Sequence, residues 1–305
     1  MIVAITGAAG YIGRFVVDEL HQHGVTIRAL LRPNTNHLGF SGPIDWISGD
    51  LSINSSLVAL VSGADTVIHL AFEHIPNRYR GGEGDNLAGW IDANMNGSLR
   101  LLLAARDARV KHFVFLSSRA VFSRTESGRV LDEEHPTSPD THYGAYKVAV
   151  EAFLKSFGLV EGMHTISIRA TGVYGLSWPI TRSKWWGLIS GVLRDETPTV
   201  ARGGTEVHGA DVARVIWMLL QQSSPGADIV HLSDLYVTER DIVQLVRHFA
   251  NKPGPLPANT NITPQNVLVC RRIAELGIPL GGQPLLEATI EGLVKAAQDD
   301  QKNKF

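Results

Sequence analysis

The chain has 305 residues, of which 19% are charged and 44% hydrophobic, and its formal net charge is -2. This is ordinary globular composition, and it excludes the clustered excess of Lys and Arg that a nucleic-acid-binding surface needs. The single cysteine, Cys270, excludes an intrachain disulfide and a cysteine-based metal site. Because no signal peptide and no apolar run of about 18 residues is recognisable, we expect a cytoplasmic protein without a membrane segment.

Short apolar runs alternate with helical patterns along the first half of the chain. The predicted strands cover residues 2–6, 25–31, 44–48, 65–71, 112–117, 164–169 and 228–232. The predicted helices cover residues 11–23, 53–61, 92–108, 141–158, 210–222, 238–250 and 284–297. The strands are rich in Val, Ile, Leu and Phe, as strands buried on both faces are. The predicted fold class is therefore α/β, a doubly wound (Rossmann) parallel sheet with a smaller C-terminal substrate lobe.

The composition changes after the sixth predicted strand, because residues 174–205 are rich in Trp, Gly and Pro. We predict a dinucleotide-binding Rossmann domain made of residues 1–170 plus 208–235. The small substrate-binding lobe is then made of residues 171–207 plus 236–305.

A glycine loop joins the first predicted strand to the first predicted helix, with Gly7, Gly10 and Gly13 in the spacing G-x-x-G-x-x-G. Glycine lets the backbone approach a pyrophosphate, and the helix N-terminus supplies free N–H groups and a positive dipole end. The plainer alternative is a tight turn without a ligand. Placement between a strand end and a helix start favours the dinucleotide, with Tyr11 and Ile12 also in contact with it.

This loop resembles that of the extended short-chain dehydrogenases/reductases, the NAD(P)-dependent epimerases, dehydratases and reductases. The resemblance extends over nearly the whole chain. It implies that Asp50 and Leu51, after the third strand, contact the adenosine part of the cofactor. It also implies that Leu70 and Ala71, in the fourth-strand motif, lie along the cofactor.

The end of the second strand bears on the choice between NAD and NADP. Folds that use NAD carry an acid there to bond the ribose 2′-OH, but this chain has Leu31 followed by Arg32. A guanidinium holds a 2′-phosphate that a carboxylate would repel. We therefore predict NADP as the cofactor, with NAD as the alternative if Arg32 is only a solvated loop residue.

Tyr143 and Lys147 form a Tyr-x-x-x-Lys pair, which a helix places on one face. A free tyrosine ionises near pH 10, and an adjacent ammonium favours the phenolate. Tyr143 is thus the predicted acid/base, and Lys147 also bonds the nicotinamide ribose. The resemblance implies that Ser118, at the end of the fifth strand, binds the substrate oxygen. The plainer alternative for the pair is an exposed helix contact.

The segment after the sixth strand borders the substrate in the resembled family, and here it contains Arg182 and Trp185. Cations and indoles suit a sugar ring that carries a negative group. Alternatively, the tryptophans pack the small lobe and the cations are solvated. Residues 73–90 form either a lid over the site or a surface loop. No His or Cys spacing indicates a metal site.

Together these features predict an NAD(P)-dependent dehydrogenase or reductase that exchanges hydride with a sugar-derived hydroxyl or carbonyl substrate. The first alternative is a nucleotide-sugar epimerase or dehydratase that retains its cofactor. Arg119 and Ala120 stand where a dehydratase would carry an acidic pair, which argues against that activity. The second alternative is a non-catalytic, cofactor-sensing regulator. The resemblance implies a homodimer, and we expect no nucleic-acid or membrane partner.

Overall fold

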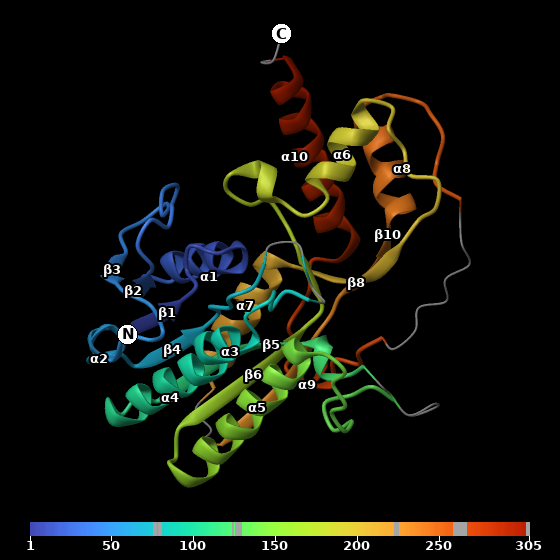
Figure 1. Cartoon of the computed structure of the whole chain (residues 1–305). Coiled ribbons are helices and arrows are strands. Elements are labelled where there is room, and N and C mark those ends of the chain that lie inside the picture. Colours follow the sequence, from blue (N-terminus) through green and yellow to red (C-terminus); the bar gives the residue numbers. More distant parts are fainter. Residues whose placement is uncertain are drawn as a thin grey trace. The chain divides into compact units, whose positions relative to one another are not determined.

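The computed structural model describes residues 1–75, 78, 81–123, 125, 130–222, 226–258 and 267–302. The chain forms two compact units (Figure 1). The first unit contains Met1–Ala170, Ala213–Leu232 and Leu268–Ile278, and the second contains Thr171–Val212, Ser233–Val267 and Pro279–Phe305. The functional division into a cofactor domain and a substrate lobe stays a prediction.

The first unit is built on a seven-stranded sheet in the order β3-β2-β1-β4-β5-β6-β9, with every pair of neighbours parallel. Its strands are β1 (Ile2–Thr6), β2 (Thr26–Leu31), β3 (Asp45–Ser48), β4 (Thr66–His69), β5 (His112–Ser118), β6 (His164–Ala170) and β9 (Ala227–Leu232). The chain reverses direction across the sheet between β3 and β4. This is a doubly wound Rossmann sheet, so the predicted fold class is confirmed.

Helices cover both faces of this sheet. They are α1 (Tyr11–Gln22), α2 (Asn54–Val61), α3 (Leu87–Ile91), α4 (Gly97–Asp107), α5 (His142–Val160), α7 (Gly209–Leu220, in this unit from Ala213) and α9 (Arg271–Glu275). Right-handed crossovers in opposite directions place α1 on one face and α2, α4 and α5 on the other. Next to α1, the His23 ring stacks on Trp217 of α7 with centroids 4.0 Å apart.

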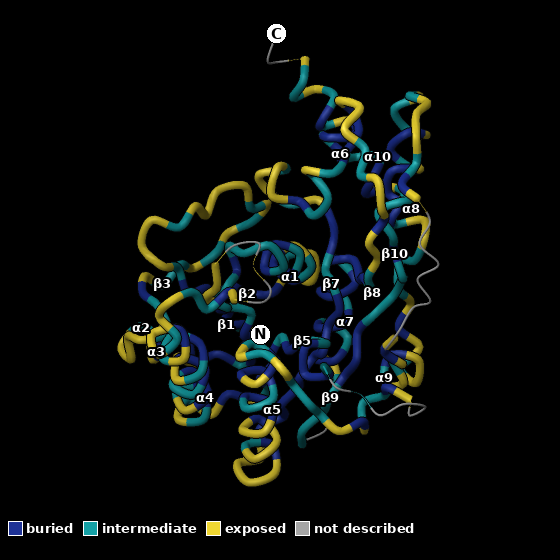
Figure 2. The backbone as a smooth tube through the Cα atoms, turned by 45° about the vertical axis from the view of Figure 1, so that its right-hand side comes forward, coloured by how far each residue is buried: buried dark blue, intermediate teal, exposed yellow. Residues whose placement is uncertain are grey.

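The core of the face covered by α2, α4 and α5 is apolar and fully buried. Leu57 and Leu60 of α2, Leu101 of α4 and Leu154 of α5 belong to one cluster with Phe113 of β5. Figure 2 shows the inner strands of this sheet, such as β1, β4 and β6, as largely buried, whereas the helices alternate buried and exposed sides. An amphipathic stripe of this kind is what the helical periodicity predicts.

The second unit has a three-stranded sheet in the order β10-β8-β7, which the apolar periodicity did not predict. Its elements are β7 (Gly172–Tyr174), α6 (Trp186–Leu193), β8 (Gly203–His208), β10 (Leu235–Thr238), α8 (Glu239–Phe249) and α10 (Gly282–Lys302). The core gathers Ile189 of α6, Val246 of α8 and Leu293 of α10. Among the described residues, no helix is long and apolar enough to cross a membrane.

Candidate active site

The glycine loop lies directly against the end of β4. Gly7 has a φ of +79°, which favours glycine, and a Cβ built on it would lie 2.7 Å from the Ala71 nitrogen and 2.8 Å from the Leu70 carbonyl carbon. A Cβ on Gly13 would lie 2.1 Å from the Gly7 carbonyl oxygen. Side chains at these positions would fill the space in which the loop backbone, β4 and α1 meet.

The start of α1 fits a phosphate group. Gly10 precedes the helix and supplies no side-chain cap, while its own N–H donates to the Gly7 carbonyl oxygen at 2.9 Å. Tyr11 and Ile12 open the first turn, where backbone N–H groups lack intrahelical acceptors. An uncapped helix start beside a bare glycine backbone matches the donors that a dinucleotide pyrophosphate requires.

Asp50 and Leu51 follow β3 and are fixed by their own neighbours. The Asp50 carboxylate accepts hydrogen bonds from the Ser52 hydroxyl at 2.5 Å and the Ser52 N–H at 2.7 Å, and these bonds hold the pKa of Asp50 below its usual value. Leu51 packs against the first residue of α4, Gly97. Asp50 is therefore ionised and oriented at neutral pH.

Arg32 is exposed at the end of β2 and pairs with Glu73, with Nη1 3.2 Å from Oε2. The backbone of Glu73 is held on both sides by Asn94, whose Oδ1 accepts from the Glu73 N–H at 2.8 Å and whose Nδ2 donates to the Glu73 carbonyl at 3.0 Å. A bound 2′-phosphate would therefore compete with the Glu73 carboxylate for Arg32.

The N-terminus of α5 is fixed against the turn that follows Ser118. The Thr141 hydroxyl caps the helix by accepting from the Gly144 N–H at 3.0 Å. A Cβ on Gly144 would lie 2.4 Å from the Ala120 carbonyl oxygen, so only glycine allows this close approach. The Ser118 hydroxyl accepts from the Ala120 N–H at 3.1 Å. Tyr143 thus lies in the first turn of a helix that is packed onto the turn after β5.

Lys147 is buried one turn after Tyr143 and donates from Nζ to the Leu116 carbonyl at 2.6 Å. Its ammonium lies 4.4 Å from the Phe115 ring centre and 5.6 Å from that of Tyr143. Burial lowers the pKa of Lys147 to about 7, and the charge of Glu151 opposes this shift. Burial and the Glu151 carboxylate therefore act in opposite directions on the charge of this lysine.

Two features of the site carried no signal in the sequence prediction. Phe72 follows the fourth-strand motif, and its ring lies 4.8 Å from that of Tyr143 and 5.4 Å from the Lys147 ammonium. Glu151, one further turn along α5, bonds Ser117 and Arg169. The interval of four residues between Tyr143, Lys147 and Glu151 can be read from the sequence. The strand residues that bond Glu151 cannot.

In the second unit, Arg182 is exposed, whereas Trp185 packs against the core. The Trp185 ring lies 5.3 Å from the buried Tyr174 ring. The neighbouring Lys184 makes an ion pair with Glu206. The indole thus has a packing role, and a substrate contact for Arg182 or Trp185 stays a prediction.

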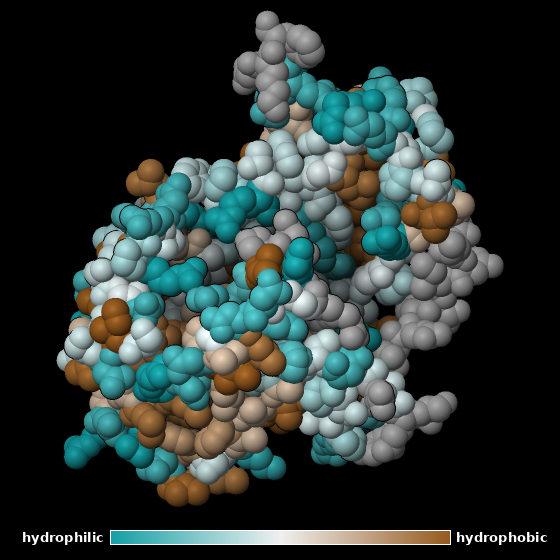
Figure 3. Space-filling view, in the orientation of Figure 1, coloured by the Kyte–Doolittle hydropathy of each residue, from teal (hydrophilic) through white to brown (hydrophobic). Residues whose placement is uncertain are grey.

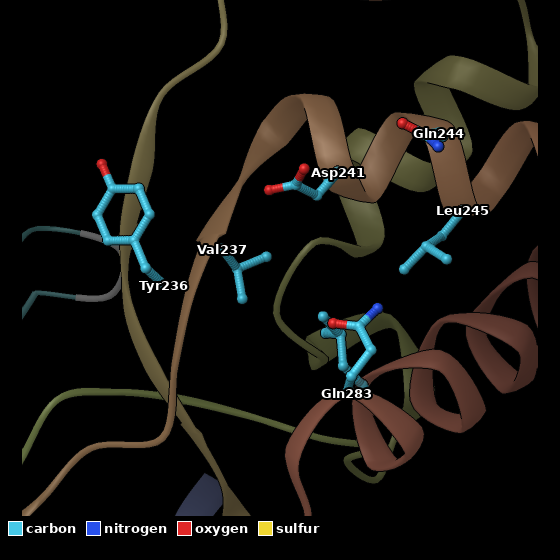
Figure 4. Close-up of a pocket in the computed structure, with 7 residues that line it drawn as sticks. Tyr236, Val237, Asp241, Gln244, Leu245 and Gln283 are labelled. Carbon is cyan, nitrogen blue, oxygen red and sulfur yellow. The ribbon is translucent and has the colours of Figure 1, made fainter. Parts of the chain in front are cut away.

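Elsewhere in the second unit, an open pocket of about 310 Å³ lies between β10, α8 and α10 (Figure 4). Its polar residues are Tyr236, Asp241, Gln244 and Gln283. Asp241 is committed to capping α8, because it accepts from the Thr238 N–H at 2.8 Å. Within the described part of the chain, no three His, Cys, Asp or Glu side chains are arranged to hold a metal ion.

Comparison with known proteins defines the class. The sequence model of the NAD dependent epimerase/dehydratase family matches residues 3–232, so the chain belongs to this family. It is 24% identical over 304 residues to a putative dihydroflavonol 4-reductase of Synechocystis, covering 97% of this chain and 84% of the relative. It is 27% identical over 184 residues to the low-salt glycan biosynthesis protein Agl12 of Haloferax volcanii, with only 57% of each chain covered.

The fold matches that of a solved UDP-glucose 4-epimerase from Thermus thermophilus in complex with NAD. The TM-score is 0.78 and the identity 22%, with 98% of this chain and 99% of the other covered. Family and fold thus confirm the resemblance to extended short-chain dehydrogenases/reductases.

Proposed function

We propose that this chain is an NAD(P)-dependent oxidoreductase that transfers hydride to or from a sugar-derived or related hydroxyl or carbonyl group. The observation that carries the proposal is the buried Lys147, which lies on the same helix face as Tyr143 and has a pKa of about 7. Burying a lysine costs free energy of solvation, and a catalytic role would explain why the chain retains it. Perturbed pKa values cluster at functional sites, and here the perturbed lysine shares a helix face with a tyrosine.

Tyr143 is the group that moves the proton in this reaction. The nicotinamide, when bound, accepts or supplies hydride. In oxidation Tyr143 takes the proton from the substrate hydroxyl, and in reduction it returns one to the carbonyl oxygen, so one proton moves with each hydride. The charged Lys147 stabilises the phenolate, and the Ser118 hydroxyl donates to the substrate oxygen and orients it.

Two other functions suit the same fold. A nucleotide-sugar epimerase is favoured by the likeness to the Thermus thermophilus epimerase, whereas the Synechocystis relative favours a reductase. An epimerase would return the hydride to the same substrate and keep its cofactor. A cofactor-sensing regulator would bind the dinucleotide without turnover, and the Tyr143–Lys147 pair speaks against it.

The test is to incubate the purified chain with NADPH or NADH and a panel of sugar carbonyls, sugar acids and aldehydes, and to follow absorbance of the reduced nicotinamide. Net consumption supports the proposal. Interconversion of UDP-glucose and UDP-galactose without net consumption would identify an epimerase instead. Dinucleotide binding without any turnover would favour the regulator.

We further propose NADP as the preferred cofactor, held by Arg32. Arg32→Ala should weaken NADP binding by about 10- to 100-fold, because charge-assisted hydrogen bonds contribute about 1.5–3 kcal/mol, and it should leave NAD binding unchanged. Glu73→Gln is the matched control, since it frees Arg32 from its ion pair and should tighten NADP binding. Calorimetric titration measures both. Tighter binding of NAD than of NADP by the unsubstituted chain would contradict the assignment.

The homodimer and the substrate contacts are also proposals. Apolar residues gather over α4 and α5 in the lower part of Figure 3, and these helices expose Leu103, Phe153, Leu159 and Val160. Apolar patches of this kind mark protein interfaces. A second copy of the chain would bury them, and a monomer in sedimentation equilibrium would overturn this proposal. Arg182 and Trp185 remain the residues proposed to contact the substrate.

A further inference from the structure

One buried carboxylate below the active site has no part in the chemistry proposed above. Tyr143, Lys147 and Glu151 follow at intervals of four residues and share one face of α5. The face becomes more buried along the helix, because Tyr143 is half-buried while only 4% of Lys147 and 6% of Glu151 is exposed. Glu151 therefore lies one turn below the catalytic lysine, away from solvent.

Three donors hold the Glu151 carboxylate in place. Ser117 of β5 and Arg169 of β6 are register partners, so they lie side by side under α5. Arg169 donates from Nη2 to Oε2 at 2.8 Å and from Nε to Oε1 at 3.1 Å, and the Ser117 hydroxyl also donates to the carboxylate. The next residue of β5, Ser118, points to the other face of the strand.

Arg169 is itself held from the far side. Its Nη1 lies 3.4 Å from Nε2 of His231 and 3.5 Å from the carbonyl oxygen of Glu133. Burial and the Arg169 charge lower the pKa of His231 to about 4, so this imidazole is neutral and accepts the bond. Arg169 and Glu151 are therefore a buried ion pair, and the far side of Arg169 meets a neutral imidazole and a backbone carbonyl.

A buried ion pair is weak support for stability, because desolvation of the two charges offsets their attraction. An apolar pair of similar volume would hold α5 on the sheet equally well. What an apolar pair would not supply is a negative charge one turn from the Lys147 ammonium. Within the described part of the chain, the other titratable groups near Lys147 are Tyr143, Tyr146 and His69 of β4, and none of these supplies a fixed negative charge.

We propose that Glu151 is a positioning residue, anchored by Ser117 and Arg169, that raises the charged fraction of Lys147 beside Tyr143. The inference rests on the proposed function, since a charged lysine matters only if Tyr143 exchanges a proton. Burial favours the neutral amine, and an adjacent carboxylate favours the ammonium. Glu151 therefore acts on the reaction through Lys147 and touches no substrate.

The test is a pH titration of the protein carrying carbon-13 at the lysine ε-carbons, followed by NMR, with the Lys147 signal assigned by its loss in Lys147→Arg. We expect Glu151→Gln to lower the Lys147 titration midpoint by about 1 pH unit. The control is Glu161→Gln, which removes an exposed carboxylate just beyond the same helix and should leave the midpoint unchanged. An unchanged midpoint in Glu151→Gln overturns the proposal.

A second variant separates charge from folding, because Glu151→Gln leaves Arg169 buried without its carboxylate. The double variant Glu151→Gln/Arg169→Gln removes both charges. A midpoint that is still below the wild-type value supports the role of the Glu151 charge, and a midpoint restored to that value overturns it. The titration needs no turnover. Absence of turnover in the unsubstituted chain would therefore refute the proposed function without changing this readout.

Discussion

Replacing Tyr143 with Phe is expected to reduce kcat by about 10²- to 10⁴-fold, the usual contribution of a positioned acid/base. The change removes only the hydroxyl, so the ring keeps its contact with Phe72 at 4.8 Å. Dinucleotide affinity should not change, because the glycine loop that is expected to bind the pyrophosphate is untouched. Steady-state kinetics with the substrate found in the cofactor screen, together with a cofactor titration, measures both quantities.

The matched control is Tyr146→Phe, three residues further along the same helix. The Tyr146 hydroxyl lies 3.1 Å from the Ser98 hydroxyl, and burial raises the pKa of this phenol far above its usual value. It is therefore a buried structural phenol, and its loss should cost about 1 kcal/mol of stability without a comparable loss of kcat. Equal kinetic losses in the two variants would show that Tyr143 has no special role.

The parts of the candidate site that follow from the sequence are those whose geometry is local. The relative positions of Gly7 and Gly13 depend on one loop and the first turn of a helix. Those of Tyr143 and Lys147 depend on one turn of helix. The support below them is not local. Glu151 meets Ser117 and Arg169 only because β5 and β6 pair in a particular register, 34 and 18 residues away along the chain. A single sequence does not define that register.

The same limit explains the differences in the fold. The helix predicted over 92–108 begins instead at Leu87 and passes through a π-helical turn at Asp92–Asn96, which carries the Asn94 side chain that holds Glu73. The spacing of apolar residues does not reveal such a turn. In the second unit, β7 has three residues and β10 has four, too few for an alternating pattern to stand out.

Acid should destabilise the first unit well above the pH at which carboxylates titrate. Burial lowers the pKa of His69 to about 3, and burial together with Arg169 lowers that of His231 to about 4. In the unfolded chain both titrate near 6.5. Their contribution to stability is complete above pH 6.5 and is lost as the pH falls toward the folded values, because only the unfolded state takes up the protons.

Below about pH 5.5, where the unfolded imidazoles are almost fully charged, each of these histidines should lower the free energy of unfolding by about 1.4 kcal/mol per pH unit, or about 2.7 kcal/mol together. Urea unfolding between pH 6.5 and 5 measures the slope. The contribution of Lys147 is small and vanishes toward pH 5, since its pKa of about 7 lies above this window in the folded state and higher still in the unfolded state. His69→Gln should reduce the slope by about 1.4 kcal/mol per pH unit, whereas the exposed His37→Gln should leave it unchanged. A flat profile would contradict this prediction, because both imidazoles would then take up protons without unfolding. The hydrogen-bonded series of Thr6, His69 and Ser98 would in that case be more open to water than its 2.7 and 2.8 Å contacts imply.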